Sequence, residues 1–178
     1  MSTVIGLVQD GKVYMGADSF ATTESGERRN MIVKKIFTNG LIMFGFVGSV
    51  RSGQVLKPEY FKVPKNIYEL PDKIRLQFEE KGCLATNSET QTSLMEGNFL
   101  IATAGGKLYE MLSDFQFNEI SDFTAIGSGS TFALGSLFTS KGIINDPKAR
   151  VLKALEASAF FDSATGPPFV TEIFLEDV

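Results

Sequence analysis

A serine directly after the first methionine is the residue of this chain best suited to act as a nucleophile. Ser2 leads into the apolar stretch Thr3–Gln9, and we expect removal of Met1 because the next side chain is small. Removal would leave one residue with a hydroxyl and a free α-amine, whose ordinary pKa of about 7.7–8.0 lets it act as a base near neutral pH. A hydroxyl activated by its own α-amine is an established nucleophile design. Met-Ser also begins many proteins without such chemistry, so the assignment depends on the rest of the chain.

The absence of histidine narrows the chemistry further. None of the 178 residues is a histidine, which excludes Ser-His-Asp and Cys-His triads and every metal site that contains histidine. Cys83 is the only cysteine and cannot form an internal disulfide, which favours a reducing compartment. We expect Cys83 to be a buried or incidental thiol, and we expect no metal and no cofactor.

Composition and charge exclude other classes of function. Hydrophobic residues make up 43% of the chain, which predicts a packed protein, and the length fits one domain over residues 1–178. The net charge of −4 argues against a nucleic-acid surface. The longest apolar run, Leu41–Gly48, is far shorter than the roughly 20 residues that span a bilayer, and the N-terminus lacks the basic segment of a signal peptide. We expect a soluble cytoplasmic protein without membrane or nucleic-acid partners.

Apolar periodicity and turn residues predict alternating groups of strands and helices. Tight turns at Asp10-Gly11, Asn39-Gly40 and Gly105-Gly106 predict three hairpins. Strands are predicted at Thr3–Gln9, Val13–Asp18, Ile32–Thr38, Leu41–Phe46, Asn98–Ala104, Lys107–Met111, Phe123–Ile126 and Phe169–Leu175. Helices are predicted at Ser49–Leu56, Ile67–Lys81, Thr131–Ser140 and Pro147–Phe161, and loops at Thr23–Asn30 and Thr86–Gly97. We therefore expect an α+β fold in which two mostly antiparallel sheets lie between helices, a four-layer αββα sandwich.

Two glycine-rich segments fail as nucleotide-binding motifs. The segment Gly127–Ser130 precedes a predicted helix, but Phe132 stands where the dinucleotide motif requires a third glycine. The segment Ala104–Lys107 is followed by Leu108 instead of the serine or threonine of a phosphate loop. Nucleotide binding is therefore not expected.

A series of short motifs, in order over nearly the whole chain, resembles the proteasome β-subunit family, including the HslV-type proteases. The motifs are Ser2–Gly6, Gly16–Asp18, Lys34, Phe44–Ser49, Ile126–Gly129 and Asp162–Gly166. Members of this family normally begin with threonine, so Ser2 would be a serine variant. The resemblance implies an N-terminal-nucleophile hydrolase that cuts peptide bonds.

The resemblance also implies the catalytic residues. They would be Ser2, Asp18, Lys34, Gly48, Ser128, Asp162 and Thr165. Ser2 would be the nucleophile, and Asp18 would hold Lys34, whose charge stabilises the alkoxide. Without the resemblance, a lysine in an apolar hairpin more often extends its ammonium group to water. The Gly48 N–H would face the oxyanion, and Ser128 and Asp162 would hold a water that carries protons.

Substrate contacts and partners follow from the same resemblance. Thr22 would pair with the substrate backbone, and an apolar pocket for the residue before the cut would be lined by Ala21, Ile32, Ile36, Phe46 and Val50. The implied substrate is a peptide or unfolded protein, cut after small or apolar residues. The implied partners are further copies in a homo-oligomeric ring and an ATPase unfoldase. Two alternatives stay open: a non-catalytic ring subunit, and an amidase of the same fold that acts on small molecules.

Overall fold

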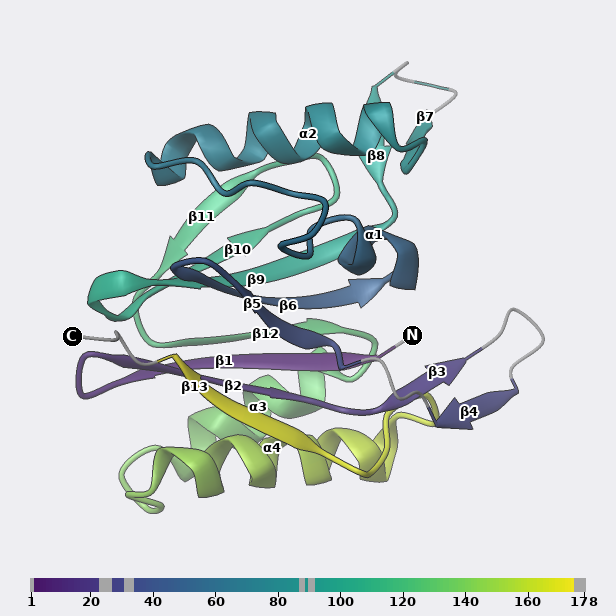
Figure 1. Cartoon of the computed structure of the whole chain (residues 1–178). Coiled ribbons are helices and arrows are strands. Elements are labelled where there is room, and N and C mark those ends of the chain that lie inside the picture. The colour runs from purple at the N-terminus through teal and green to yellow at the C-terminus, as the bar shows by residue number, and fades with distance from the viewer. Residues whose placement is uncertain (1, 23–26, 31–33, 87–88, 90–91, 175–178) are drawn as a thin grey trace.

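Two antiparallel sheets packed face to face form the centre of the protein (Figure 1). The computed structural model describes residues 2–22, 27–30, 34–86, 89 and 92–174. The four-stranded sheet contains β1 (Thr3–Gln9), β2 (Lys12–Ala17), β12 (Phe123–Gly127) and β13 (Val170–Phe174), in the order β12-β1-β2-β13. The five-stranded sheet contains β5 (Ile36–Asn39), β6 (Ile42–Gly48), β9 (Gly97–Thr103), β10 (Lys107–Met111) and β11 (Phe117–Ile120), in the order β11-β10-β9-β6-β5. β1 therefore lies between β12 and β2.

Helices cover the outer side of each sheet (Figure 1). The five-stranded sheet is covered by α1 (Val50–Gln54), the 3-10 turn η1 (Ile67–Glu69) and α2 (Leu70–Glu80); a second 3-10 turn, η2 (Ala104–Gly106), joins β9 to β10. The four-stranded sheet is covered by α3 (Ser130–Ser140) and α4 (Pro147–Phe161). The predicted four-layer αββα arrangement is confirmed. Within the described part of the chain, no helix is long and apolar enough to cross a membrane.

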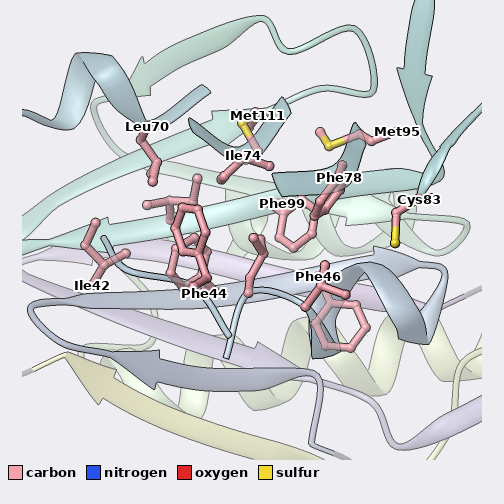
Figure 2. Packing of buried hydrophobic residues seen from close by; sticks show 14 of the residues in the cluster. Ile42, Phe44, Phe46, Leu70, Ile74, Phe78, Cys83, Met95, Phe99 and Met111 are labelled. Carbon is pink, nitrogen blue, oxygen red and sulfur yellow. The ribbon is translucent and has the colours of Figure 1, made fainter. Parts of the chain in front are cut away.

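Apolar side chains fill all three spaces between the layers. Phe44, Phe78 and Phe99 belong to the cluster between α2 and the five-stranded sheet (Figure 2). Val4 belongs to the cluster between the sheets, and its neighbour Ile5 to the cluster under α3 and α4. Successive strand residues point to opposite faces, so a strand in the middle layers must be apolar on both. This explains why the strands predicted from the sequence are almost continuously apolar.

Several short elements differ from the predictions. Two small antiparallel pairs were not predicted, β3 (Phe20–Thr22) with β4 (Arg28–Asn30), and β7 (Leu84–Thr86) with β8 (Ser93–Met95). Of these strands, β4 and β8 lie within segments predicted as loops. β11 was not predicted, because its short and partly polar sequence shows no alternation. β5 begins at Ile36, whereas the predicted strand began at Ile32, a residue outside the described part of the chain.

Candidate active site

The candidate nucleophile, Ser2, lies directly before β1, one of the two inner strands of the four-stranded sheet. Ser2 is 5% exposed, and Thr3, the first residue of β1, pairs with Gly127 of β12. Gly127 has φ +101, and a Cβ atom there would lie 1.9 Å from the Ser2 carbonyl oxygen. Only glycine allows this approach. The glycine-rich segment Gly127–Ser130 therefore brings β12 against the nucleophile.

A buried ion pair lies on one side of Ser2. The Lys35 Nζ is 2.6 Å from Asp18 Oδ1 and 2.6 Å from the Phe20 carbonyl oxygen, and both charged side chains are almost fully buried. Asp18 Oδ1 also accepts the Thr3 N–H at 2.9 Å, while Asp18 Oδ2 accepts the Phe20 N–H at 3.0 Å. Burial lowers the pKa of Lys35, although the Asp18 charge and hydrogen bond oppose that shift.

The lysine beside Asp18 is not the one predicted. Lys34 lies on the surface with its side chain 64% exposed, and its Nζ is 3.3 Å from Glu172 Oε1. Lys35 continues the β5–β6 ladder, because its carbonyl accepts the Phe46 N–H at 3.0 Å. A shift of one residue along an extended segment turns the side chain to the opposite face. The prediction that Asp18 holds Lys34 is therefore wrong, and Lys35 occupies that position.

A second carboxylate network lies on the other side of Ser2. Asp162 Oδ2 accepts the hydroxyls of Ser128 and Thr165, each at 2.7 Å, and Asp162 Oδ1 accepts the Ala164 N–H at 3.1 Å. Burial alone would raise the pKa of Asp162, but these hydrogen bonds together hold that pKa below its ordinary value. The Ser128 Oγ lies 3.5 Å from the Ser2 carbonyl oxygen, longer than an ordinary O–H···O bond.

Gly48 ends β6 beside the same region. Its φ is +96, and a Cβ there would lie 2.6 Å from the Glu96 carbonyl oxygen, so glycine is required at this position. The Val47 Cγ1 would lie 3.1 Å from a Cβ on Gly127, which brings the end of β6 next to the start of β1. Gly48, Ser2 and the two carboxylate networks thus come from distant parts of the sequence to one end of the sheets.

The residues predicted to contact the substrate lie in different parts of the structure. Ala21 and Thr22 lie in β3, Val50 begins α1, and Ile32 is outside the described residues. Ile36 is 2% exposed and belongs to the cluster between the sheets. Phe46 is 3% exposed, and its ring lies only 2.4 Å from where a Cβ on Gly53 would stand.

Phe46 therefore fills the space beneath α1 with its own ring. That ring is also within 6.3 Å of the Phe37 ring and 6.2 Å of the Phe99 ring, measured between centroids. Figure 2 shows Phe46 beside Phe99 in the aromatic cluster of β6 and β9. Gly53 permits this packing, because any larger side chain would meet the ring.

Sequence reasoning missed two residues of the site, Lys35 and Thr3. Lys35 directly follows the predicted Lys34, and nothing in the sequence shows which of these two adjacent lysines faces Asp18. The Thr3 hydroxyl lies 2.7 Å from the Thr165 hydroxyl, a contact between residues far apart in the chain. Among the described residues, no group of three or more His, Cys, Asp or Glu side chains could hold a metal ion. The arrangement therefore places the Ser2–Thr3 peptide unit between a buried ion pair and a hydrogen-bonded carboxylate.

Comparisons with known proteins agree with this fold. The model of the family described as proteasome subunit matches residues 1–166. Among solved structures, Thiobacillus denitrificans BPH has a TM-score of 0.83 at 22% identity, over 96% of this chain and 96% of that chain. The structure of the same protein in complex with epoxomicin has a TM-score of 0.77 at 22% identity, over 96% of this chain and 97% of that chain. HslV from Trypanosoma brucei has a TM-score of 0.71 at 19% identity, over 96% of this chain and 98% of that chain. No curated protein matches the chain significantly.

Proposed function

Because the chain belongs to the proteasome subunit family, we propose that it is a peptidase whose N-terminal nucleophile is Ser2, exposed by removal of Met1. One observation carries the proposal. The Asp18–Lys35 pair and the Asp162 network approach the Ser2–Thr3 peptide unit from opposite sides, with the Thr3 N–H bound to Asp18 and the Ser128 Oγ next to the Ser2 carbonyl.

The reaction would proceed through an ester on Ser2. The Ser2 Oγ attacks the carbonyl carbon of the peptide bond while its proton passes to the Ser2 α-amine. The tetrahedral intermediate collapses, the C–N bond breaks, and the departing amine takes the proton from the α-ammonium. A water molecule then attacks the ester carbonyl carbon and gives a proton to the same α-amine. The bond between the acyl carbon and Ser2 Oγ breaks, Ser2 Oγ takes that proton back, and the acid is released. The α-amine acts as the base and its protonated form as the acid, so the scheme needs no histidine, which the chain lacks.

Lys35 would supply positive charge where the alkoxide develops. The ion pair with Asp18 supports this role, because a buried ammonium acts in a region of low dielectric constant. The same charge lowers the pKa of a nearby α-ammonium, so more of the Ser2 amine is free to accept a proton. Lys35 takes over the role that the sequence analysis assigned to Lys34.

Ser128 would orient the α-amine. The single hydrogen of its hydroxyl is used in the 2.7 Å bond to Asp162, so its lone pairs can accept a hydrogen from the amine or from a water. Thr165 strengthens the arrangement by donating to the same Asp162 oxygen. The Gly48 N–H would donate to the oxyanion, and one such donor typically contributes about 2.7–4 kcal/mol to transition-state stabilisation.

The proposed substrate is a peptide or an unfolded polypeptide. Members of the proteasome and HslV group form oligomeric rings, and we propose a homo-oligomeric ring of this single domain in the cytoplasm, supplied with substrate by an ATPase unfoldase. The buried ring of Phe46 supports cleavage after small residues. Thr22 in β3 would pair with the substrate backbone, and Ala21 in β3 and Val50 at the start of α1 would line the pocket for the residue before the cut.

Intact mass spectrometry with a peptide epoxyketone tests the proposal. This reagent needs both the hydroxyl and the free α-amine of the first residue to close its two bonds. We expect a chain that lacks Met1 and carries one adduct, together with hydrolysis of reporter peptides. Ser2→Ala should give neither the adduct nor hydrolysis. To keep the test independent of the expression host, a ubiquitin fusion cleaved directly before Ser2 provides the free terminus.

The other outcomes would replace the proposal. A chain with Ser2 at its terminus, but with no adduct and no hydrolysis, would be a non-catalytic ring subunit. An adduct together with hydrolysis of small amides but not of peptides would indicate an amidase of the same fold.

A further inference from the structure

Thr3 is bonded through three of its groups to the two sides of the site. Its N–H donates to Asp18 Oδ1 at 2.9 Å, and its carbonyl accepts the Asp18 N–H at 3.2 Å. Its hydroxyl lies 2.7 Å from the Thr165 hydroxyl. The side chain is fully buried, and the following residues of β1, Val4 and Ile5, are apolar. A hydroxyl at this place in the core therefore has a specific bonding partner.

The direction of the hydroxyl bond follows from the number of hydrogens. Thr165 has one hydroxyl hydrogen and donates it to Asp162 Oδ2 at 2.7 Å. The Thr3 hydroxyl must therefore be the donor in the bond to Thr165. This gives a directed series from Thr3 to Thr165 to Asp162, and it ends on the same oxygen that accepts the Ser128 hydroxyl.

Little free space is left around the Thr3 and Thr165 hydroxyls. A Cβ atom on Gly129 would lie 2.3 Å from the Thr3 Oγ1 and 3.1 Å from the Thr165 Oγ1. Glycine at position 129 therefore leaves the space that the two hydroxyls occupy. The Gly129 carbonyl accepts the Ser158 hydroxyl at 2.9 Å, which ties this loop to α4. With little free volume, the Thr3 side chain is held in one orientation.

We propose that Thr3 is a positioning residue that connects the Asp18–Lys35 pair to the Asp162 network and thereby fixes the orientation of Ser2. The inference rests on the proposed function of Ser2 as nucleophile. Ser2 and Thr3 share a peptide plane, so a rotation of Thr3 moves the Ser2 carbonyl and Cα directly. A displacement of about 1 Å at a reacting group can cost roughly 100-fold in rate, so a bond that prevents such a displacement affects catalysis.

Substitutions at Thr3 separate this role from simple packing. Thr3→Val keeps the β-branched shape and removes the hydroxyl, whereas Thr3→Ser keeps the hydroxyl and removes the methyl group. We expect Thr3→Val to lower kcat for a reporter peptide about tenfold while KM changes by less than about twofold, because orientation and not binding is lost. Thr3→Ser should recover most of the wild-type kcat.

Thr124→Val is the matched control. Thr124 is a buried threonine of β12 in the same sheet, with a side-chain hydrogen bond to Glu110 Oε2 at 3.3 Å. Its substitution removes an equivalent hydroxyl away from the site, and we expect wild-type kcat. Thermal unfolding of every variant shows whether it is folded. If Thr3→Val does not fold, Thr3→Ala compared with Thr3→Ser makes the same comparison.

The inference fails if Thr3→Val retains the wild-type kcat. It also fails if Thr3→Ser lowers kcat as much as Thr3→Val does, because the loss would then come from the methyl group and not from the hydroxyl. Failure of the proposed function is a different result. In that case the wild-type chain itself, with Ser2 at its terminus, forms no epoxyketone adduct.

Discussion

Adjacent residues in this site can have opposite environments. Lys35 is buried against Asp18, whereas Lys34 is exposed and paired with Glu172. An exposed ion pair contributes about 0–1 kcal/mol to stability, while breaking a buried pair leaves an uncompensated charge and costs about 3–5 kcal/mol. The two lysines are therefore a natural pair of test and control.

We expect Lys35→Met to abolish most peptide hydrolysis and to destabilise the fold by about 3–5 kcal/mol, because Asp18 is left charged and buried. Lys34→Met should leave both quantities near the wild-type values. Urea unfolding and kcat/KM for one reporter peptide measure the two effects. The double variant Asp18→Asn/Lys35→Met should recover stability without recovering activity. Equal loss of activity in Lys34→Met would contradict the assignment of Lys35.

The lowered pKa of Asp162 predicts how stability depends on pH. Because the folded protein favours the charged form, Asp162 stabilises the fold fully above its unfolded pKa of about 3.9 and loses that contribution as pH falls through the lower folded pKa. Asp162→Asn cannot titrate. We therefore expect the difference in unfolding free energy between wild type and Asp162→Asn to be largest above about pH 4 and to shrink below it. Urea unfolding across this range measures the difference, and a difference that grows on acidification would contradict the prediction.

At the scale of elements, the packing of α1 against β6 determines the space next to Gly48. Phe46 lies two residues before Gly48, and its ring rests on Gly53 of α1. Under the proposed function, this ring occupies the volume that a large substrate side chain before the cut would need. The short helix and the bulky strand residue together make the pocket small.

We expect the wild-type protein to cleave after small residues such as alanine, and Phe46→Ala to shift preference toward larger apolar residues. The substitution should also destabilise the fold by about 3–5 kcal/mol. Phe99→Ala is the control, because Phe99 lies in the same cluster and its loss should cost a similar amount of stability, but we do not assign it to the substrate pocket. The ratio of kcat/KM for phenylalanine and alanine peptides measures preference. Strong cleavage only after Lys, Arg, Asp or Glu, or an unchanged ratio in Phe46→Ala, would contradict the prediction.

Elements with strong local signals were predictable from the sequence. The Asp10-Gly11 turn between two apolar runs defines the β1–β2 hairpin. α4 begins at Pro147, as predicted, and the structure adds that the Asp146 carboxylate caps it by accepting the N–H groups of Lys148 and Ala149. β11 and the small pairs β3–β4 and β7–β8 were not predictable, because strands of three or four partly polar residues are defined by their partners and not by their own periodicity.

The types of residue in the candidate site were predictable from the sequence, but which of two adjacent lysines faces Asp18 was not. Asp18, Ser128, Asp162 and Thr165 lie where the motifs suggested that they would be near Ser2. Lys35 was missed because a shift of one residue reverses the face of an extended chain, and a count along the sequence cannot detect it. Thr3 was missed because its hydroxyl bond joins residues that only the fold brings together.

At the scale of the whole molecule, exposed apolar side chains among the described residues gather on the outer side of α3 and α4. α3 contains no charged residue. The large apolar side chains exposed on the two helices are Phe132, Leu134, Phe138, Leu152, Phe160 and Phe161. Phe161 stacks on Phe132 with ring centroids 5.0 Å apart. In Figure 1 no described element covers this side of the helices.

The size of this face fits contact with another copy of the chain. At about 200 Å² for a whole phenylalanine, the exposed parts of these six side chains amount to roughly 600 Å², at the upper limit for one patch on a monomer. A stable interface buries about 800 Å² per partner. Because α3 has no charged residue, α3 itself adds no like-charge repulsion against a second copy. The proposed ring assembly supplies such a copy, and we expect it to cover this face.

Phe138→Lys tests that expectation against Leu41→Lys. Phe138 on α3 is 72% exposed, and Leu41 in the β5–β6 turn is 73% exposed, so both substitutions place a charge on an equally open side chain. Neither should change the stability of the isolated chain by more than about 0.5 kcal/mol. Burying an unpaired ammonium in an interface is costly, so Phe138→Lys should shift sedimentation velocity profiles toward smaller species, whereas Leu41→Lys should sediment as wild type. A wild-type chain that stays monomeric, or a Phe138→Lys variant that assembles fully, would contradict burial of this face by a second copy.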